Sequence, residues 1–222
     1  MSAIKIYLIF LIGYDIIIIV NEKRRNQMKK YELTTNTKIV LSGKKLYQIR
    51  ALKDFGNVKA GQLGGYIEKE ENLSHDSNAW IFGNARVSGN ARVSGNAQVY
   101  GNAEVSDNAW VYGNAEIFGN AEIFDNAWVT GNVYIYDSAC ICGNAWVTGN
   151  ADYICFKGFG SENRNTTMFR TKDRDIFVRC GCFAGSLKEF SEKVGETHGN
   201  SKYAKEYLAC VEVARIHFEI DD

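Results

Sequence analysis

From Ser77 to Ile154, small and branched apolar residues recur at fixed places in a unit of six residues, repeated thirteen times without a gap. The unit is typified by Gly83-Asn84-Ala85-Arg86-Val87-Ser88. Its third residue is nearly always Ala and its fifth Val or Ile, so on an extended strand both point to one face. The first two residues, mostly Gly or Asp followed by Asn, enter left-handed backbone conformations easily and predict a turn in every unit.

A short strand and a sharp turn, repeated many times, predict a coil of parallel strands in which each turn covers the one before it. The outward positions indicate how many strands make one turn. With three strands per turn, residues eighteen apart superpose, and the aromatic residues fall into two columns: Phe82, Tyr100, Phe118 and Tyr136, and Trp110, Trp128 and Trp146. The sequence therefore predicts a mainly β protein, a triangular parallel β-helix of about four coils over residues 77–154.

The flanking segments lack the repeat and predict a cap at each end. Residues 28–76 predict a small β cap with strands near 38–41, 46–52 and 65–68, and with turns at Ser42-Gly43 and Gly64-Gly65. A cap is expected on physical grounds, because an open coil exposes unpaired strand edges that promote polymerisation.

Residues 155–222 predict a small α+β domain. Strands near 166–170 and 176–179 form a hairpin, and Ser186 with Glu189 is a capping box that begins a helix ending near Gly199. A second helix follows, with an apolar stripe at helical spacing made of Tyr203, Tyr207, Val211, Ala214 and Phe218.

Residues 1–27 have three interpretations. The stretch 3–20 is long enough to anchor the chain in a membrane, although Lys5 and Asp15 interrupt it. Alternatively, translation begins at Met28, because Arg24-Arg25 can be encoded by the purine run that bacterial ribosomes bind. The third interpretation is a buried helix or strand.

The outward side chains define three faces of the coil. The first face carries Trp80, Phe82, Gln98, Tyr100, Glu116, Phe118, Tyr134 and Tyr136. The second carries Arg86, Ser88, Glu104, Ser106, Glu122, Phe124, Cys140 and Cys142. The third carries Arg92, Ser94, Trp110, Tyr112, Trp128, Thr130, Trp146 and Thr148. The second face suits water, whereas the other two expose more large aromatic residues than a soluble monomer usually leaves open.

Three kinds of cover suit these aromatic faces: the flanking domains, other copies of the chain, or an external ligand. The candidate binding residues are Trp110, Tyr112, Trp128, Trp146, Phe82, Tyr100, Phe118 and Tyr136. Trp and Tyr are favoured anchors at protein interfaces, which favours binding over chemistry.

Composition narrows the function classes. The 26 basic and 26 acidic residues balance, which argues against a generally cationic nucleic-acid binder. Six cysteines without a secretory signal favour free thiols in the bacterial cytoplasm, and Cys140 and Cys142 are expected to face solvent or a partner. Cys180 and Cys182 with two histidines match no common zinc spacing, so we expect neither metal nor cofactor. The run 158–161 predicts a turn, with an anion site shared with Arg164 as the alternative.

The tandem Gly-Asn-Ala-x-Val-x units resemble the hexapeptide-repeat left-handed β-helix, known from acyltransferases and γ-class carbonic anhydrases. Left-handed coiling and trimeric packing are implied by this resemblance alone. Over residues 28 to about 218 the chain is also similar to small phage- and prophage-encoded proteins, often labelled polymer-forming, which bring no established activity. The shared segments lie at 30–34, 51–56, 64–68, 170–173 and 180–183.

The enzymes of the hexapeptide class use histidines as general base or zinc ligands, and residues 77–154 contain no His. We therefore expect a non-enzymatic phage-type protein that binds its own copies first, as a trimer, or captures a host protein or a small molecule. The alternative is an acyltransferase whose base is His75, His198 or His217 from outside the coil. His75 itself is expected at the first coil's interior or end, in a capping role.

Overall fold

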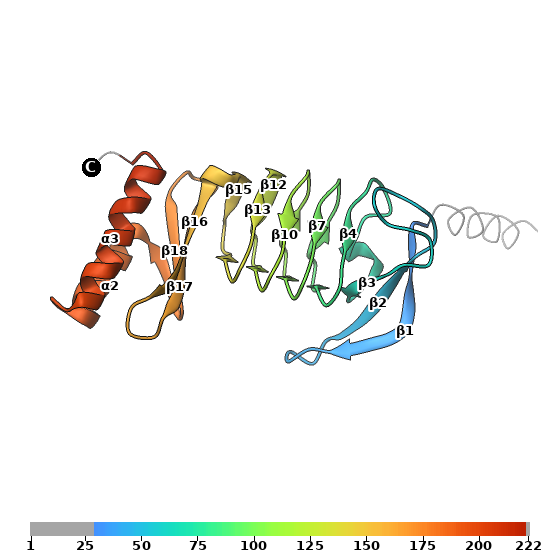
Figure 1. Ribbon diagram of the computed structural model, residues 1–222, viewed down its shortest axis with the longest axis horizontal. Coiled ribbons are helices and arrows are strands. Elements are labelled where there is room, and N and C mark those ends of the chain that lie inside the picture. The colour runs from blue at the N-terminus through green and yellow to red at the C-terminus, as the bar shows by residue number, and fades with distance from the viewer. Residues whose placement is uncertain (1–28, 221–222) are drawn as a thin grey trace, which may run out of the picture.

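The computed structural model describes residues 29–220, so the predictions for residues 1–27 and for a start at Met28 lie outside the described residues. Three parts follow one another along the long axis of the molecule (Figure 1). The N-terminal part contains β1 (Tyr31–Ile39), β2 (Lys45–Ala51), β3 (Leu63–Ile67) and the 3-10 turn η1 (Glu70–Asn72). Between β1 and β2 lies the predicted turn at Ser42-Gly43, where Gly43 has φ 77°.

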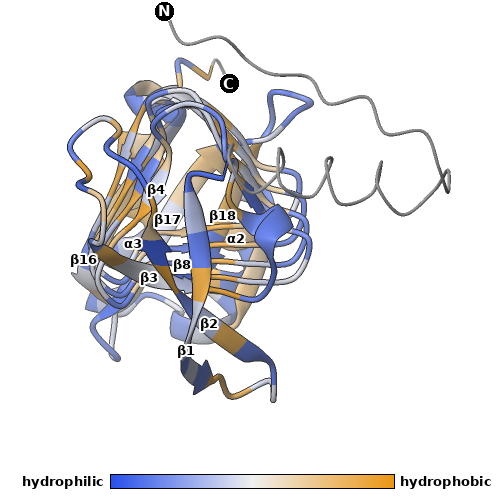
Figure 2. Ribbon diagram, turned by 90° about the vertical axis from the view of Figure 1, so that its right-hand side faces the viewer, coloured by the Kyte–Doolittle hydropathy of each residue, from blue (hydrophilic) through white to orange (hydrophobic). Residues whose placement is uncertain are grey.

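The middle part is a solenoid of twelve short strands. These are β4 (Trp80–Ile81), β5 (Arg86–Val87), β6 (Arg92–Val93), β7 (Gln98–Val99), β8 (Glu104–Val105), β9 (Trp110–Val111), β10 (Glu116–Ile117), β11 (Glu122–Ile123), β12 (Trp128–Asn132), β13 (Tyr134–Ile135), β14 (Cys140–Ile141) and β15 (Trp146–Gly149). They form three parallel stacks, β4-β7-β10-β13, β5-β8-β11-β14 and β6-β9-β12-β15. Partners are eighteen residues apart, as in Trp110↔Trp128. The predicted three-sided parallel β-helix is confirmed, and Figure 2 shows the coils one behind another along the axis.

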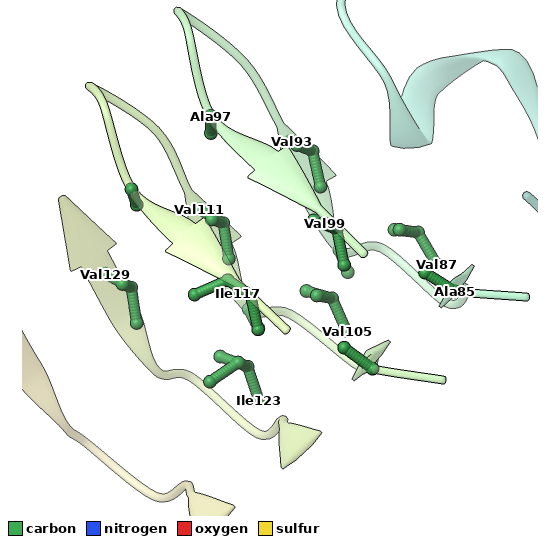
Figure 3. Close-up of a cluster of buried hydrophobic side chains, with 14 of the residues drawn as sticks. Ala85, Val87, Val93, Ala97, Val99, Val105, Val111, Ile117, Ile123 and Val129 are labelled. Carbon is green, nitrogen blue, oxygen red and sulfur yellow. The ribbon is translucent and has the colours of Figure 1, made fainter. Parts of the chain in front are cut away.

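The turns and the interior follow the repeat. The first residue of each unit from Ser77 to Gly143 has a positive φ between 58° and 75°, whichever of Gly, Asp or Ser is present. In the twelve units from Ser77 to Thr148, the Ala and Val or Ile positions point inward, and each is at most 1% exposed (Figure 3). Gly149 has φ −164°, so the thirteenth unit does not turn back into the coil but continues through η2 (Asn150–Asp152) into the next sheet.

The solenoid begins earlier than the repeat does. Strand β3 pairs in parallel with β5, and Leu73 forms a parallel bridge with Val93, so five parallel strands lie along one face. The prediction of about four coils is therefore low by one, because this first coil lacks the six-residue pattern.

The predicted turn at Gly64-Gly65 is wrong, since both residues lie inside β3. They are glycines because there is no room for a side chain. A Cβ on Gly64 would lie 2.6 Å from Ile49 Cγ1, and one on Gly65 would lie 2.5 Å from the Ala85 carbonyl oxygen.

The two ends of the solenoid have opposite polarity. Each backbone N–H donates to the carbonyl one coil further along, as Trp80 N does to Ala97 O, so the first regular coil leaves carbonyls free. Donors from the N-terminal part satisfy these carbonyls. Lys30 Nζ donates to Ala79 O at 2.8 Å, and Asn72 Nδ2 donates to Ala91 O at 2.8 Å. Buried Lys30 and Asn72 therefore act as side-chain caps of the coil.

The last coil leaves N–H groups free, and acceptors satisfy them. Asn150 Oδ1 accepts from Tyr134 N at 2.8 Å, Thr167 Oγ1 accepts from Cys140 N at 3.0 Å, and Asp152 accepts from Thr148 N at 2.8 Å. Cationic or amide donors at one end and oxygen acceptors at the other thus close the ladder and blunt both edges.

The C-terminal part is an antiparallel sheet of β16 (Tyr153–Phe159), β17 (Arg164–Arg170), β18 (Ile176–Cys180) and β19 (Phe183–Ser186), followed by α2 (Leu187–His198) and α3 (Lys202–His217). The capping box is confirmed, because Ser186 Oγ accepts from Glu189 N and Ser186 N donates to Glu189 Oε2 at 2.7 Å. Four stripe residues of the second helix are buried and Tyr203 is half-buried. Strands β16 and β19, which flank the predicted hairpin, were not predicted from the sequence.

Across residues 29–220, neither helix has the length and apolar character needed to span a lipid bilayer.

Burial of the Lys30 ammonium gives a testable pH dependence. Desolvation lowers the pKa of Lys30 from 10.5 to about 8, so above pH 8 the folded chain loses this proton while the unfolded chain keeps it. Stability therefore rises with pH here, by about 2 kcal/mol between pH 8 and about pH 9.5. Urea unfolding of the wild type across this window, compared with Lys30→Met, measures the difference. If the free energy of unfolding changes with pH equally in the two proteins, the lowered pKa of Lys30 is refuted.

Candidate functional site

The tryptophan face, defined here as Arg92, Trp110, Tyr112, Trp128 and Trp146, is the most regular side-chain array on the solenoid. Trp110 and Trp128 stack with ring centroids 5.1 Å apart and planes 10° apart, and Trp128 and Trp146 stack at 5.0 Å and 11°. The guanidinium carbon of Arg92 lies 5.4 Å from the Trp110 ring centroid and continues the column. The structure thus brings together the predicted tryptophan column.

The polar atom of the central indole is satisfied within this face. Trp128 Nε1 donates to the Tyr112 hydroxyl at 2.6 Å, and the two rings meet edge to face at 5.2 Å. Because this N–H already has an acceptor, covering the face with another molecule leaves no indole donor of Trp128 unpaired. The central indole can therefore be covered without loss of its hydrogen bond.

Stacking also determines which part of each ring is offered to a partner. The column runs along the solenoid axis, so the ring faces contact one another and the ring edges point outward. A sugar or base that stacks on aromatic faces would find those of Trp128 occupied on both sides. Trp110 and Trp146 are nevertheless 39% and 37% exposed. An edge-lined apolar strip of this kind fits against another surface better than it holds a flat ligand.

The predicted phenyl-tyrosyl column is present as two stacked pairs. Phe82 and Tyr100 stack at 4.7 Å, and Phe118 and Tyr136 stack at 5.6 Å. Tyr136 is 49% exposed and its neighbour Tyr134 is 47% exposed. This aromatic face is therefore less continuous than the tryptophan face.

Two outward residues are covered by the flanking parts of the chain, contrary to expectation. Trp80 is fully buried and meets the rings of Tyr31 and Phe55 edge to face. Cys142 is only 4% exposed, and its thiol is hydrogen bonded to that of Cys140. That bond lowers the pKa of Cys140, with Arg179 contributing, and raises the pKa of Cys142. Neither Trp80 nor Cys142 is available to a partner.

The corners of the solenoid contain a feature that was not predicted from the sequence. The second residue of the unit, Asn in all units but one, forms ladders of side-chain amides, as in Asn78 to Asn96 to Asn114 to Asn132, each Nδ2 donating to the next Oδ1 at 2.7–3.2 Å. Recurrence of Asn in all units but one was the available signal. The ladders stiffen the corners and explain why Asn, in addition to Gly, recurs at the turns.

The three histidines proposed as alternative bases lie in different surroundings. His75 stacks on Tyr31 at 4.3 Å in the N-terminal part, where its Nδ1 accepts from Lys30 N and burial lowers its pKa. His198 lies near Tyr207, with ring centroids 5.6 Å apart, and lines a cavity of the C-terminal part. His217 lies beside Phe218 at the end of α3.

Within residues 29–220, no three or more His, Cys, Asp or Glu side chains are grouped so as to hold a metal ion. Cys180 instead contacts Thr166 Oγ1 at 3.1 Å in the interior of the C-terminal part.

Comparison with known proteins agrees with this architecture. Residues 79–95, 85–101 and 97–113 match the profile described as the YdcK β-solenoid repeat. No curated protein matches the chain. The repeat, the parallel stacks and this match define the chain as a repeat β-solenoid protein.

Proposed function

We propose that this β-solenoid is a non-enzymatic binding scaffold, and that its first partner is another copy of the same chain docked on the tryptophan face. The observation that carries the proposal is the stacked column of Trp110, Trp128 and Trp146, whose ring edges are exposed and whose central N–H is already paired. Such a strip is rigid and aromatic, and Trp and Tyr are favoured anchors at protein interfaces.

The capped ends favour a closed assembly over a filament. Lys30 and Asn72 satisfy the first coil, and Asn150, Thr167 and Asp152 satisfy the last, so end-to-end strand addition is blocked. Association through the sides of the prism remains, and a trimer is the assembly that the hexapeptide-repeat resemblance implies. Three finer hypotheses rest on the similarity to phage- and prophage-encoded proteins. They are a phage or prophage origin, action in the host cytoplasm and capture of a host protein.

Acyl transfer, the alternative, is less well supported. None of His75, His198 and His217 lies on a coil face, and each makes ring contacts within its own part of the chain.

Replacing all three column residues tests the proposal. In Trp110→Ser, Trp128→Ser, Trp146→Ser, we expect the assembly to dissociate, because each anchor contributes about 2 kcal/mol or more. Light scattering should give about three times the chain mass of 24.9 kDa for the wild type and the single-chain mass for the variant. Far-ultraviolet circular dichroism confirms that the variant is folded.

The matched control is Tyr134→Ser, Tyr136→Ser on the other aromatic face, which should keep the wild-type mass. A monomeric wild type, or a triple variant that stays associated, would rule out the tryptophan face as the contact between copies.

A further inference from the structure

The C-terminal part contains a cavity of about 490 Å³ between the β16–β17 turn, the β18–β19 turn and α2. Its wall is mainly apolar and includes Phe183, Phe190, Val194 and Tyr207. Phe190 and Val194 are each 3% exposed, so the floor is held by the core of this part rather than by mobile surface groups. The volume is in the range of sites for small organic molecules.

Two cationic side chains line this apolar cavity. They are Arg164 and Lys193, beside the imidazole of His198, and Glu162 is the one lining carboxylate among the described residues. Lys193 is paired with Glu196 at 3.0 Å. The Arg164 guanidinium, by contrast, makes no ion pair or hydrogen bond with any residue in the range 29–220. An apolar recess with an unpaired guanidinium is complementary to an apolar molecule that carries a negative charge.

The side chain of Arg164 lies close to the β18–β19 turn. Gly181 has φ 57°, and a Cβ there would lie 2.4 Å from Arg164 Nη1 and 3.0 Å from Arg164 Cδ. The glycine between Cys180 and Cys182 therefore lets the arginine side chain lie across the turn. On the opposite wall, Gly160 makes room for the side chain of Tyr207, because a Cβ at Gly160 would lie 2.0 Å from the Tyr207 hydroxyl oxygen.

We propose that this cavity binds a small organic acid with an apolar body, its anionic group on Arg164 and its body against Phe190 and Tyr207. The planar fork of a guanidinium matches a carboxylate or phosphate group, and the apolar wall supplies the remaining affinity. The site is separate from the tryptophan face, so it stands whether or not the chain self-associates.

A matched pair of fluorescent probes tests both halves of the proposal. Anilinonaphthalene sulfonate carries a negative charge, whereas phenyl-naphthylamine has the same ring system without it. We expect both to bind the full chain with a single-site isotherm. Arg164→Gln should weaken the sulfonate about tenfold and leave the neutral probe unchanged, as expected for the loss of one charge-assisted contact.

Three further variants locate the site. Ala184→Trp, at an exposed lining position, should abolish binding of both probes. Arg174→Gln removes an exposed guanidinium elsewhere and should change neither affinity. Trp128→Ser should leave the affinity of both probes unchanged. A loss of affinity in this variant would mean that the probes bind on the tryptophan face instead. Thermal unfolding of each variant checks that the fold is kept.

Displacement of the sulfonate by naphthoate or by naphthyl phosphate then distinguishes a carboxylate from a phosphate group. The proposal fails if neither displaces the probe, or if binding survives Ala184→Trp. It also fails if Arg164→Gln weakens the charged and neutral probes equally, because the cavity would then be apolar without anion selectivity.

Discussion

Trp80→Ala is expected to destabilise the protein by about 3–5 kcal/mol, the range for removing a large buried aromatic side chain. Trp80 has no exposed surface and lies where the N-terminal part meets the first regular coil. It meets Phe55 and Tyr31 edge to face, at 5.3 and 6.1 Å between ring centroids. Its removal therefore leaves a cavity between cap and solenoid. Urea unfolding followed by circular dichroism measures the loss.

Trp80→Phe is the matched control. Trp80 Nε1 has no hydrogen-bond acceptor among residues 29–220, so this substitution loses no hydrogen bond and keeps most of the aromatic contact. We expect a loss of about 1–2 kcal/mol. Hydrogen exchange should show faster opening of β1 and β2 in Trp80→Ala than in Trp80→Phe. If the two variants are equally stable, Trp80 does not join the cap to the coil.

The position of Trp80 shows what the sequence can and cannot predict. Its unit has the same pattern as the units of Trp110 and Trp128, so periodicity alone places all three indoles outward. What differs is the neighbour: Tyr31 and Phe55 come from segments that occur once in the chain and carry no repeat. Contacts between a repeated and an unrepeated segment leave no periodic signal.

Within the solenoid, by contrast, the prediction was accurate. The same constraint acts on every coil, so the inward Ala and Val, the positive-φ first residue and the register of Trp110 on Trp128 all follow from one six-residue unit. Of the C-terminal cavity, the sequence indicated only the alternative anion site that combines the run 158–161 with Arg164. Its wall combines residues from two turns and two helices that are distant in sequence.

Gly65→Ala is expected to cost about 3 kcal/mol, although it adds only a methyl group and overpacking by one methyl usually costs about 1–3 kcal/mol. The added Cβ would lie 2.5 Å from Ala85 O and 2.5 Å from Ile81 Cγ2. Ala85 O is a backbone atom that accepts from Tyr66 N at 2.9 Å, so it cannot move aside without breaking the β3–β5 pairing. Urea unfolding should show the loss.

Gly149→Ala separates this steric effect from the general effect of replacing glycine. Gly149 has extended backbone and nothing within 4 Å of an added Cβ, so we expect a change of no more than about 0.5 kcal/mol. Displacement of β3 in Gly65→Ala should also uncover the edge of β5 and promote association that depends on protein concentration. Equal stabilities for the two variants would mean that β3 tolerates a side chain here. The glycine pair would then have to be explained by backbone freedom, as the predicted turn assumed, and not by the close approach of β3 to the first coil.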